Sequence, residues 1–163
     1  MTEREVADRL AITDQIYRYC RSVDRLDVAV GHGVFHPDSY ADFGLYRGTG
    51  RGWIDFICQE HRKFLHHSHQ VTNIVIDLDG DRAGSEAYVT ATLRAYDGDR
   101  LMQRQFWARY VDAWSKRDGR WAIDTRECVI DFASVGEVTA LGEHSRSQRD
   151  TRDPSYEVLR SPA

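Results

Sequence analysis

Cysteine is scarce in this sequence, and the few cysteines lie far apart. Cys20, Cys58 and Cys128 match no metal-binding spacing. We therefore expect reduced thiols, which are typical of a cytoplasmic protein. The first residues are charged and include no apolar signal segment, which favours the same location.

Long apolar runs and an excess of positive charge are also missing. No run approaches the roughly 20 residues that span a bilayer, so we expect no membrane partner. Lys and Arg total 22 against 26 Asp and Glu, a net charge of −4. Nucleic-acid binding usually relies on a net positive field, so we expect no nucleic-acid partner. Neither a phosphate-binding glycine loop nor a nucleophile elbow occurs.

The periodic segments of the 163 residues predict one α+β domain. Apolar residues recur at helical spacing over 6–23, a short helix follows Asp27, and another helix runs over 51–65. A strand is predicted over 39–47, with Tyr40 and Tyr46 on one face. Three turns containing Asp-Gly separate alternating segments at 83–96, 101–114 and 121–132, which predicts a meander. We expect a strongly curved antiparallel or mixed sheet wrapped around three N-terminal helices. This domain covers residues 1–135, and residues 136–163 form a polar tail, either flexible or lying on a neighbouring subunit.

A histidine-rich stretch, residues 66–73, stands where the helical pattern changes to a strand pattern. Alternation places His69, Val71, Asn73 and Val75 on one face of that strand. An imidazole on an apolar wall needs a partner, because burying it unpaired is costly. Asp24, at the end of the first helix, can reach the open mouth of a cone built in this way. A carboxylate there would fix the tautomer of the imidazole.

Two other interpretations of polar residues stay open at this point. His67 and His69 share a strand face and could be two metal ligands, but no third ligand is evident, so we predict no metal and no cofactor. Arg109 and Trp107 share a second strand face. If that face lines the cone, Arg109 and Arg126 would bind a carboxylate or an oxyanion; otherwise they face outward.

Four motifs in this order resemble the SnoaL-like polyketide-cyclase branch of the nuclear transport factor 2-like fold, over residues 5–133. They are Tyr19…Ser22-Val23-Asp24-Arg25, His69-x-x-x-Asn73, Asp79-Gly80-Asp81-Arg82-Ala83 and Trp121-x-x-x-x-Arg126. That branch includes hexachlorocyclohexane dehydrochlorinase, bile-acid dehydratase and scytalone dehydratase. The resemblance implies that Asp24 orients His69, which removes a proton during elimination. It also implies substrate contacts from Tyr19, from Arg126, and from a first-strand tyrosine that is either Tyr40 or Tyr46.

The expected activity is therefore that of a cofactor-independent lyase acting on a hydrophobic cyclic or aromatic small molecule. The catalytic residues would be His69, Asp24 and Tyr19. The substrate-binding residues would be Arg126, Tyr40, Tyr46, Trp107 and Arg109. An isomerase or cyclase, a retro-aldol lyase, a non-catalytic binding module and a partner subunit of a larger metalloprotein are the alternatives. Relatives in this branch are commonly trimers or dimers, and the outer sheet is rich in aromatic residues, so a homo-oligomer is expected.

Overall fold

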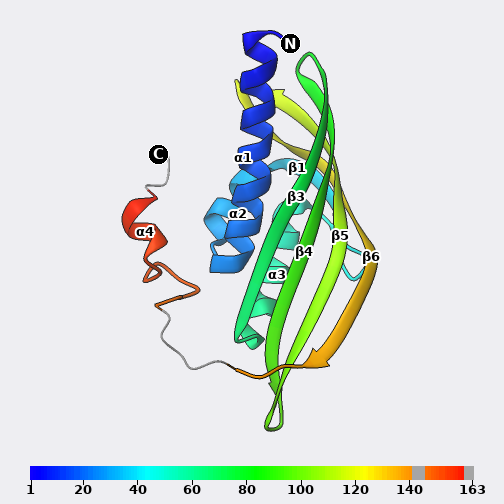
Figure 1. Ribbon diagram of the computed structural model, residues 1–163. Helices are drawn as coiled ribbons and strands as arrows, with labels where there is room; N and C mark the ends of the chain where they lie inside the picture. Colours follow the sequence, from blue (N-terminus) through cyan, green and yellow to red (C-terminus); the bar gives the residue numbers. More distant parts are fainter. Residues whose placement is uncertain (141–145, 160–163) are drawn as a thin grey trace.

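Three helices lie against one face of a six-stranded sheet in the computed structural model, which describes residues 1–140 and 146–159 (Figure 1). The helical elements are α1 (Glu3–Arg25), α2 (Val28–Val34), α3 (Gly50–Glu60), the 3₁₀ turn η1 (His61–Lys63) and α4 (Ser155–Val158). The strands are β1 (Phe35–Asp42), β2 (Arg47–Gly48), β3 (His66–Asp79), β4 (Arg82–Asp97), β5 (Arg100–Arg117) and β6 (Arg120–Glu137). The predicted α+β class with a mixed sheet is thereby confirmed.

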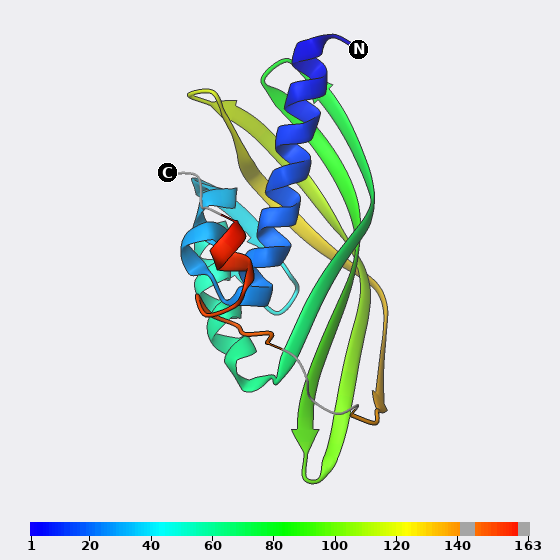
Figure 2. The same ribbon diagram turned by 60° about the vertical axis from the view of Figure 1, so that its left-hand side comes forward.

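The sheet order is β2-β1-β6-β5-β4-β3, and only the β1–β6 pair is parallel. The long strands β3 to β6 bend around α1 and α3, as the turned view in Figure 2 shows. Each hairpin turn between them has a glycine at positive φ, at Gly80, Gly98 and Gly119. Glycine adopts this conformation without the steric cost that a Cβ adds, which is why the Asp-Gly pairs predicted the meander.

Helix α1 begins and ends where local chemistry dictates. The Thr2 hydroxyl accepts from the Glu5 amide at 3.2 Å and the Glu5 carboxylate accepts from the Thr2 amide at 2.6 Å, a capping box. The helix stops at Leu26, which has a left-handed φ of 55°. One side of the helix is buried through Ile12, Ile16 and Tyr19. Asp24 therefore lies in the last turn, next to the end of the buried stripe.

The histidine-bearing strand β3 differs from simple alternation. A register shift lies between Val71, opposite Val89, and Ile74, opposite Ala87. An extra residue in one strand inverts the facing of everything after it. Val75 is accordingly 62% exposed and Ile76 only 8%. The prediction that Asn73 and Val75 share the face of His69 is wrong.

The predicted strand over 39–47 is wrong too, because the chain turns within it. The Asp42 carboxylate accepts from the Gly44 amide at 2.8 Å and from Arg47 Nε at 2.9 Å. Gly44 has a φ of 74°, which a tight turn needs. Strand β1 therefore ends at Asp42, with Tyr40 on this strand and Tyr46 in the loop before β2.

The described part of the C-terminal segment, residues 146–159, packs on the helices of its own chain. Arg25 pairs with Asp153 at 2.9 Å, and the Tyr156 hydroxyl donates to Asp27 at 2.7 Å. Arg149 donates to the His61 carbonyl at 2.8 Å. This segment is therefore neither a free tail nor an arm that reaches away.

No helix among the described residues is long and apolar enough to cross a membrane.

Candidate functional site

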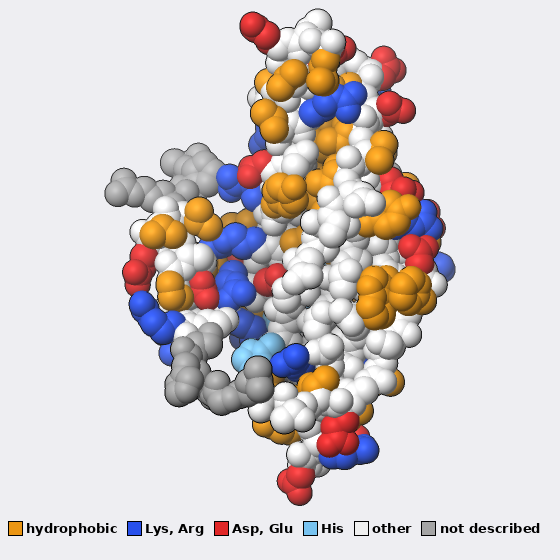
Figure 3. Space-filling model, viewed as in Figure 1, with side chains coloured by type: hydrophobic (Ala, Val, Ile, Leu, Met, Phe, Trp, Pro, Cys, Tyr) orange, Lys and Arg blue, Asp and Glu red, His pale blue; other side chains and the backbone are white. Residues whose placement is uncertain are grey.

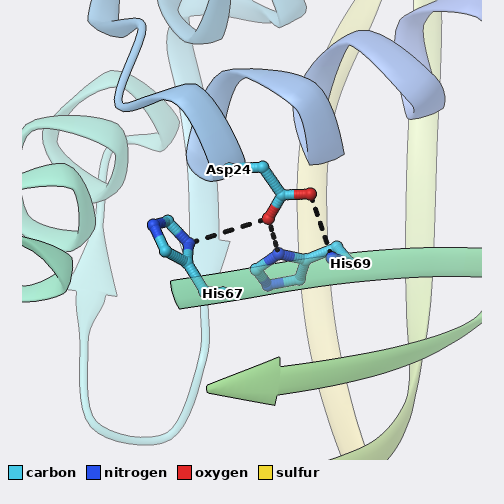
Figure 4. A group of neighbouring side chains, drawn as sticks. All are labelled: Asp24, His67 and His69. Atoms are coloured by element: carbon cyan, nitrogen blue, oxygen red, sulfur yellow. Dashed lines mark hydrogen bonds and ion pairs between the residues drawn. The ribbon is translucent and has the colours of Figure 1, made fainter. Parts of the chain in front are cut away.

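Asp24 and His69 form a close pair where the end of α1 meets the start of β3 (Figure 4). Asp24 Oδ1 lies 2.7 Å from His69 Nδ1, and Oδ2 accepts from the His69 backbone amide at 3.0 Å. Only 13% of the Asp24 side chain and 8% of the His69 side chain are exposed. In a neutral imidazole, a carboxylate at this position accepts from Nδ1–H, which leaves the lone pair on Nε2. Within the described residues, no group hydrogen-bonds to Nε2.

His69 lies on the wall of an apolar cavity of about 260 Å³ between the helices and the inner face of the sheet. Aromatic and aliphatic side chains from α1, α3 and the inner face of β4, β5 and β6 make up most of this wall. Its lining includes Tyr19, Val23, Phe43, Trp53, Phe56, Ile57, Val89, Ala91, Leu93, Phe106, Ala108, Tyr110, Cys128 and Ile130. Such a cavity fits a small hydrophobic ligand.

Tyr19 lines this cavity together with His69, whereas Asp24 lies behind the His69 ring and does not line the cavity. Its hydroxyl accepts from Trp53 Nε1 at 2.8 Å. Burial raises the pKa of Tyr19 far above its ordinary value, so the phenol keeps its proton. Because Trp53 can only donate, the Tyr19 proton remains available to an acceptor in the cavity.

Arg126 is not at the cavity surface, contrary to the prediction of a substrate contact. Its Nε and Nη2 donate to the two oxygens of Asp112, both at 2.7 Å, and both side chains are fully buried. The guanidinium carbon lies 4.2 Å from the ring centroids of both Tyr19 and Tyr110. Arg126 therefore supports the tyrosines from behind and reaches no substrate.

Trp107 and Arg109 lie on the opposite face of β5, so their prediction as substrate-binding residues is wrong. Phe106, Ala108 and Tyr110 face the cavity, and alternation turns the residues between them outward. Trp107 stacks on Phe132 with a centroid distance of 4.7 Å. Arg109 pairs with Asp131 at 2.9 Å and with Glu86 at 3.0 Å.

Neither Tyr40 nor Tyr46 lines the cavity. Tyr40 is 48% exposed and lines a separate surface hollow. Tyr46 packs against Trp53 and Phe56, with centroid distances of 5.6 Å to each, and its hydroxyl donates to the Thr49 carbonyl at 3.1 Å. Tyr46 therefore stands behind the cavity wall.

Two further histidines surround His69. The ring centroids of His61 and His67 lie 4.8 Å apart, and those of His61 and His69 lie 6.2 Å apart. Burial lowers the pKa of His67 to about 2 and that of His61 to about 3. Both are therefore neutral at physiological pH. The side chain of His67 is fully buried.

Asp24, His67 and His69 are also the group that could hold a metal ion. One ligand atom from each lies within 4.8 Å of the others, and Asp24 is the third ligand that the sequence did not reveal. His67 Nδ1 lies 3.6 Å from Asp24 Oδ1. Arg25 and Arg149 lie close enough to lower the pKa of His67, and their charges oppose a cation at this position. One carboxylate and two imidazoles are ligands of the kind that zinc prefers, but the two nearby arginines make the site unfavourable for a cation.

Several cavity residues were missed from the sequence: His61, Tyr110, Phe106 and Arg104. Between Arg104 and Tyr110 the even-numbered residues of β5 line the cavity, and Tyr110 belongs to that series. Because β5 carries aromatic side chains on both faces, alternation alone did not tell inside from outside. Cys128 also lines the cavity, and burial raises the pKa of its thiol to about 11, so it is no thiolate at neutral pH.

The model of the SnoaL-like domain family matches residues 4–127 of this chain. The chain belongs to the SnoaL-like family. No protein with curated annotation matches this SnoaL-like sequence.

Solved structures share the fold at low sequence identity. A protein from Novosphingobium aromaticivorans, provisionally assigned as a scytalone dehydratase, is 22% identical, with a TM-score of 0.73 over 91% of this chain and 100% of its own. Hexachlorocyclohexane dehydrochlorinase LinA-type3 from Novosphingobium barchaimii is 15% identical, with a TM-score of 0.71 over 86% and 97%. A variant of Rv3472, a protein of unknown function from Mycobacterium tuberculosis, is 24% identical, with a TM-score of 0.69 over 79% and 75%. These likenesses confirm the expected fold of this SnoaL-like chain, whose relatives include lyases and proteins without a known function.

Proposed function

We propose that this protein is a cofactor-independent lyase that removes a proton from a hydrophobic cyclic or aromatic substrate and expels a leaving group from the β carbon. The observation that carries the proposal is the 2.7 Å contact between Asp24 Oδ1 and His69 Nδ1 on the wall of an apolar cavity. Among SnoaL-like structures, the provisionally assigned dehydratase and the dehydrochlorinase have names that agree with elimination chemistry.

His69 acts as the general base in this proposal. Its Nε2 takes the proton from the C–H bond, the C–H electrons form the new double bond, and the leaving group departs with its own bonding pair. Asp24 stabilises the imidazolium that results. Positioned proton transfer of this kind contributes about 10²–10⁴-fold to the rate.

Tyr19 supplies the complementary proton. Its hydroxyl is held by Trp53 at 2.8 Å and keeps a free proton for a leaving oxygen or a carbonyl oxygen. The positive charge of Arg126 over the ring lowers the pKa of Tyr19 against the larger effect of burial, which strengthens the phenol as a donor. Isomerisation or retro-aldol cleavage would begin with the same proton removal, so these remain the alternative reactions of the site.

Proton removal can be tested without knowing the leaving group. The protein is incubated in D₂O with a panel of aryl-fused cyclic β-hydroxy ketones and enones, in the presence of a chelator, and deuterium uptake and new products are followed by mass spectrometry. We expect His69→Ala to lower the rate by about 10² or more while ligand affinity changes little. His66→Ala is the matched control, since His66 is an exposed neighbour on β3.

Full activity in His69→Ala would contradict the proposal. Loss of activity in strict proportion to the folded fraction, measured by melting temperature on the same sample, would assign His69 a structural role. Ligand binding with no exchange or turnover in the wild type would favour the non-catalytic binding module.

A further inference from the structure

Arg104 is a positive charge on the cavity wall. It lies on β5 two residues before Phe106 and four before Ala108, so all three face the helices. The cavity lining includes Arg104, and its side chain is exposed at the rim. No residue of 1–140 or 146–159 forms a hydrogen bond or ion pair with the Arg104 guanidinium.

Two other charged residues of the cavity lining pair with each other. Lys63 Nζ lies 2.5 Å from the Glu60 carboxylate, and both residues line the cavity. Arg104 is left as the uncompensated charge beside a wall that is otherwise largely apolar. Two arginines on the outer face of the sheet do have side-chain partners. Arg94 donates to Gln103, and Arg109 pairs with two carboxylates.

The strand register places Arg104 at a defined separation from the histidines. Arg104 lies opposite Leu93 on β4, and Leu93 lies opposite His67 on β3. His69 and Phe106 both lie opposite Ala91, in the next inward-facing row. Two strand spacings, about 10 Å, therefore separate the backbone of Arg104 from that of His67, and the backbone of His69, one inward-facing row further along, is somewhat farther away. One or two fused rings fill such a distance.

We propose that Arg104 binds an anionic group of the substrate, so that the ligand is an aromatic or cyclic acid with its carboxylate at the rim and its acidic C–H bond at His69. This inference rests on the proposed function, because the orientation assumes that His69 is the base. A guanidinium pairs with a carboxylate through two parallel N–H···O bonds, which fixes direction as well as charge. An arginine at the rim keeps the acid end near water while the rings enter the apolar cavity.

Two probes of nearly the same shape test the inference by calorimetry at pH 7.5. 2-Naphthoate is ionised at this pH and 2-naphthamide is neutral, because carboxylic acids have pKa values of about 4. We expect the wild type to bind naphthoate about fivefold more tightly than the amide, in line with a partly exposed ion pair. Arg104→Gln should abolish this preference by weakening naphthoate only, and Arg104→Lys should keep part of it.

Arg94→Gln is the matched control, since it removes the same charge from the neighbouring strand and from the outer face. It should leave the preference for naphthoate intact, with the melting temperature of every variant confirming the fold. Equal affinities in the wild type, no binding of naphthoate, a preference that survives in Arg104→Gln, or the same loss in Arg94→Gln would each overturn the inference. Because the titration needs no turnover, an inactive His69→Ala protein that still prefers naphthoate would leave this inference standing even if the lyase proposal failed.

Discussion

One carboxylate, Asp24, holds both the ring and the backbone of His69. Oδ1 lies 2.7 Å from the ring Nδ1, and Oδ2 accepts from the amide of the same residue at 3.0 Å. The two contacts connect the last turn of α1 to the first residues of β3. Asp24 therefore fixes the position of His69 as well as its tautomer.

Replacing Asp24 by Asn should separate these two roles. The amide is nearly the same size but offers one acceptor oxygen instead of two, so either the ring or the backbone contact is weakened. We expect the fold to persist while turnover falls by about 10² or more, because the amide can hold the wrong tautomer. Turnover and melting temperature on the same sample check this. Asp14→Asn, on the exposed part of α1, should leave turnover unchanged.

The buried pair of Arg126 and Asp112 should matter for stability. Arg126→Met leaves a fully buried carboxylate without its partner, which costs about 3–5 kcal/mol in the free energy of unfolding. The double variant Arg126→Met/Asp112→Leu should recover most of that loss, because no buried charge remains. Urea unfolding measures each value.

The outer face offers a control for that experiment, since Arg109 also pairs with carboxylates there. Its side chain is 27% exposed, so Arg109→Met should lower the free energy of unfolding much less than Arg126→Met does. A loss in Arg126→Met as small as that in Arg109→Met would contradict the structural role of the buried pair.

Acid should destabilise the protein through its buried histidines. The pKa of His67 is lowered to about 2 and that of His61 to about 3, against 6.5 in the unfolded chain. As the pH falls below about 6.5 the unfolded state binds protons that the folded state refuses, so stability is lost, by about 1.4 kcal/mol per pH unit per histidine. This loss continues until the pH approaches the folded pKa values. Above about pH 6.5 both rings are neutral in the folded and in the unfolded state, so their contribution to the free energy of unfolding no longer changes with pH.

His67→Phe should lower the number of protons that the chain takes up on unfolding in acid by about one. The free energy of unfolding should then depend less steeply on pH. The ring is surrounded by His61, His69, Asp24, Arg25 and Arg149, so the exposed His66→Phe serves as the control for a general change in charge. Urea unfolding at several pH values between 7.5 and 4.5 gives the slopes. An unchanged slope in His67→Phe would show that this ring is protonated in the folded state.

The outer face of the sheet should form an interface between copies of this chain. Figure 3 shows hydrophobic side chains in groups on the side of the sheet that faces away from the helices. Phe132 is 60% exposed, Tyr88 41% and Val111 39%, and Trp107 stacks on Phe132. We expect a homo-oligomer, a trimer more than a dimer, by light scattering at micromolar concentration, and Phe132→Arg should shift it toward the monomer. A monomeric wild type would contradict this prediction.

Local sequence patterns were enough to predict the order of the elements and the chemistry at the junction of α1 and β3. Helical spacing and a capping box defined α1, Asp-Gly turns defined the hairpins, and a strand histidine that needed a partner pointed to Asp24. These features depend on residues close together in the chain, or on the end of one helix meeting the start of one strand. The tail beyond β6 had no such local pattern, and only its contacts with Arg25 and Asp27 placed it.

Which face of each strand points inward became clear only from the packing of the strands against the helices. Alternation groups Trp107 with Arg109 and Phe106 with Arg104, but both faces of β5 carry aromatic residues, so the pattern does not say which group lines the cavity. The bulge after Val71 reversed the facing of β3 without a sequence signal, and the turn at Gly44 separated Tyr40 from Tyr46. Arg126 was misassigned because its partner Asp112 lies on the neighbouring strand, and a pairing across strands is set by register, which a single sequence does not reveal.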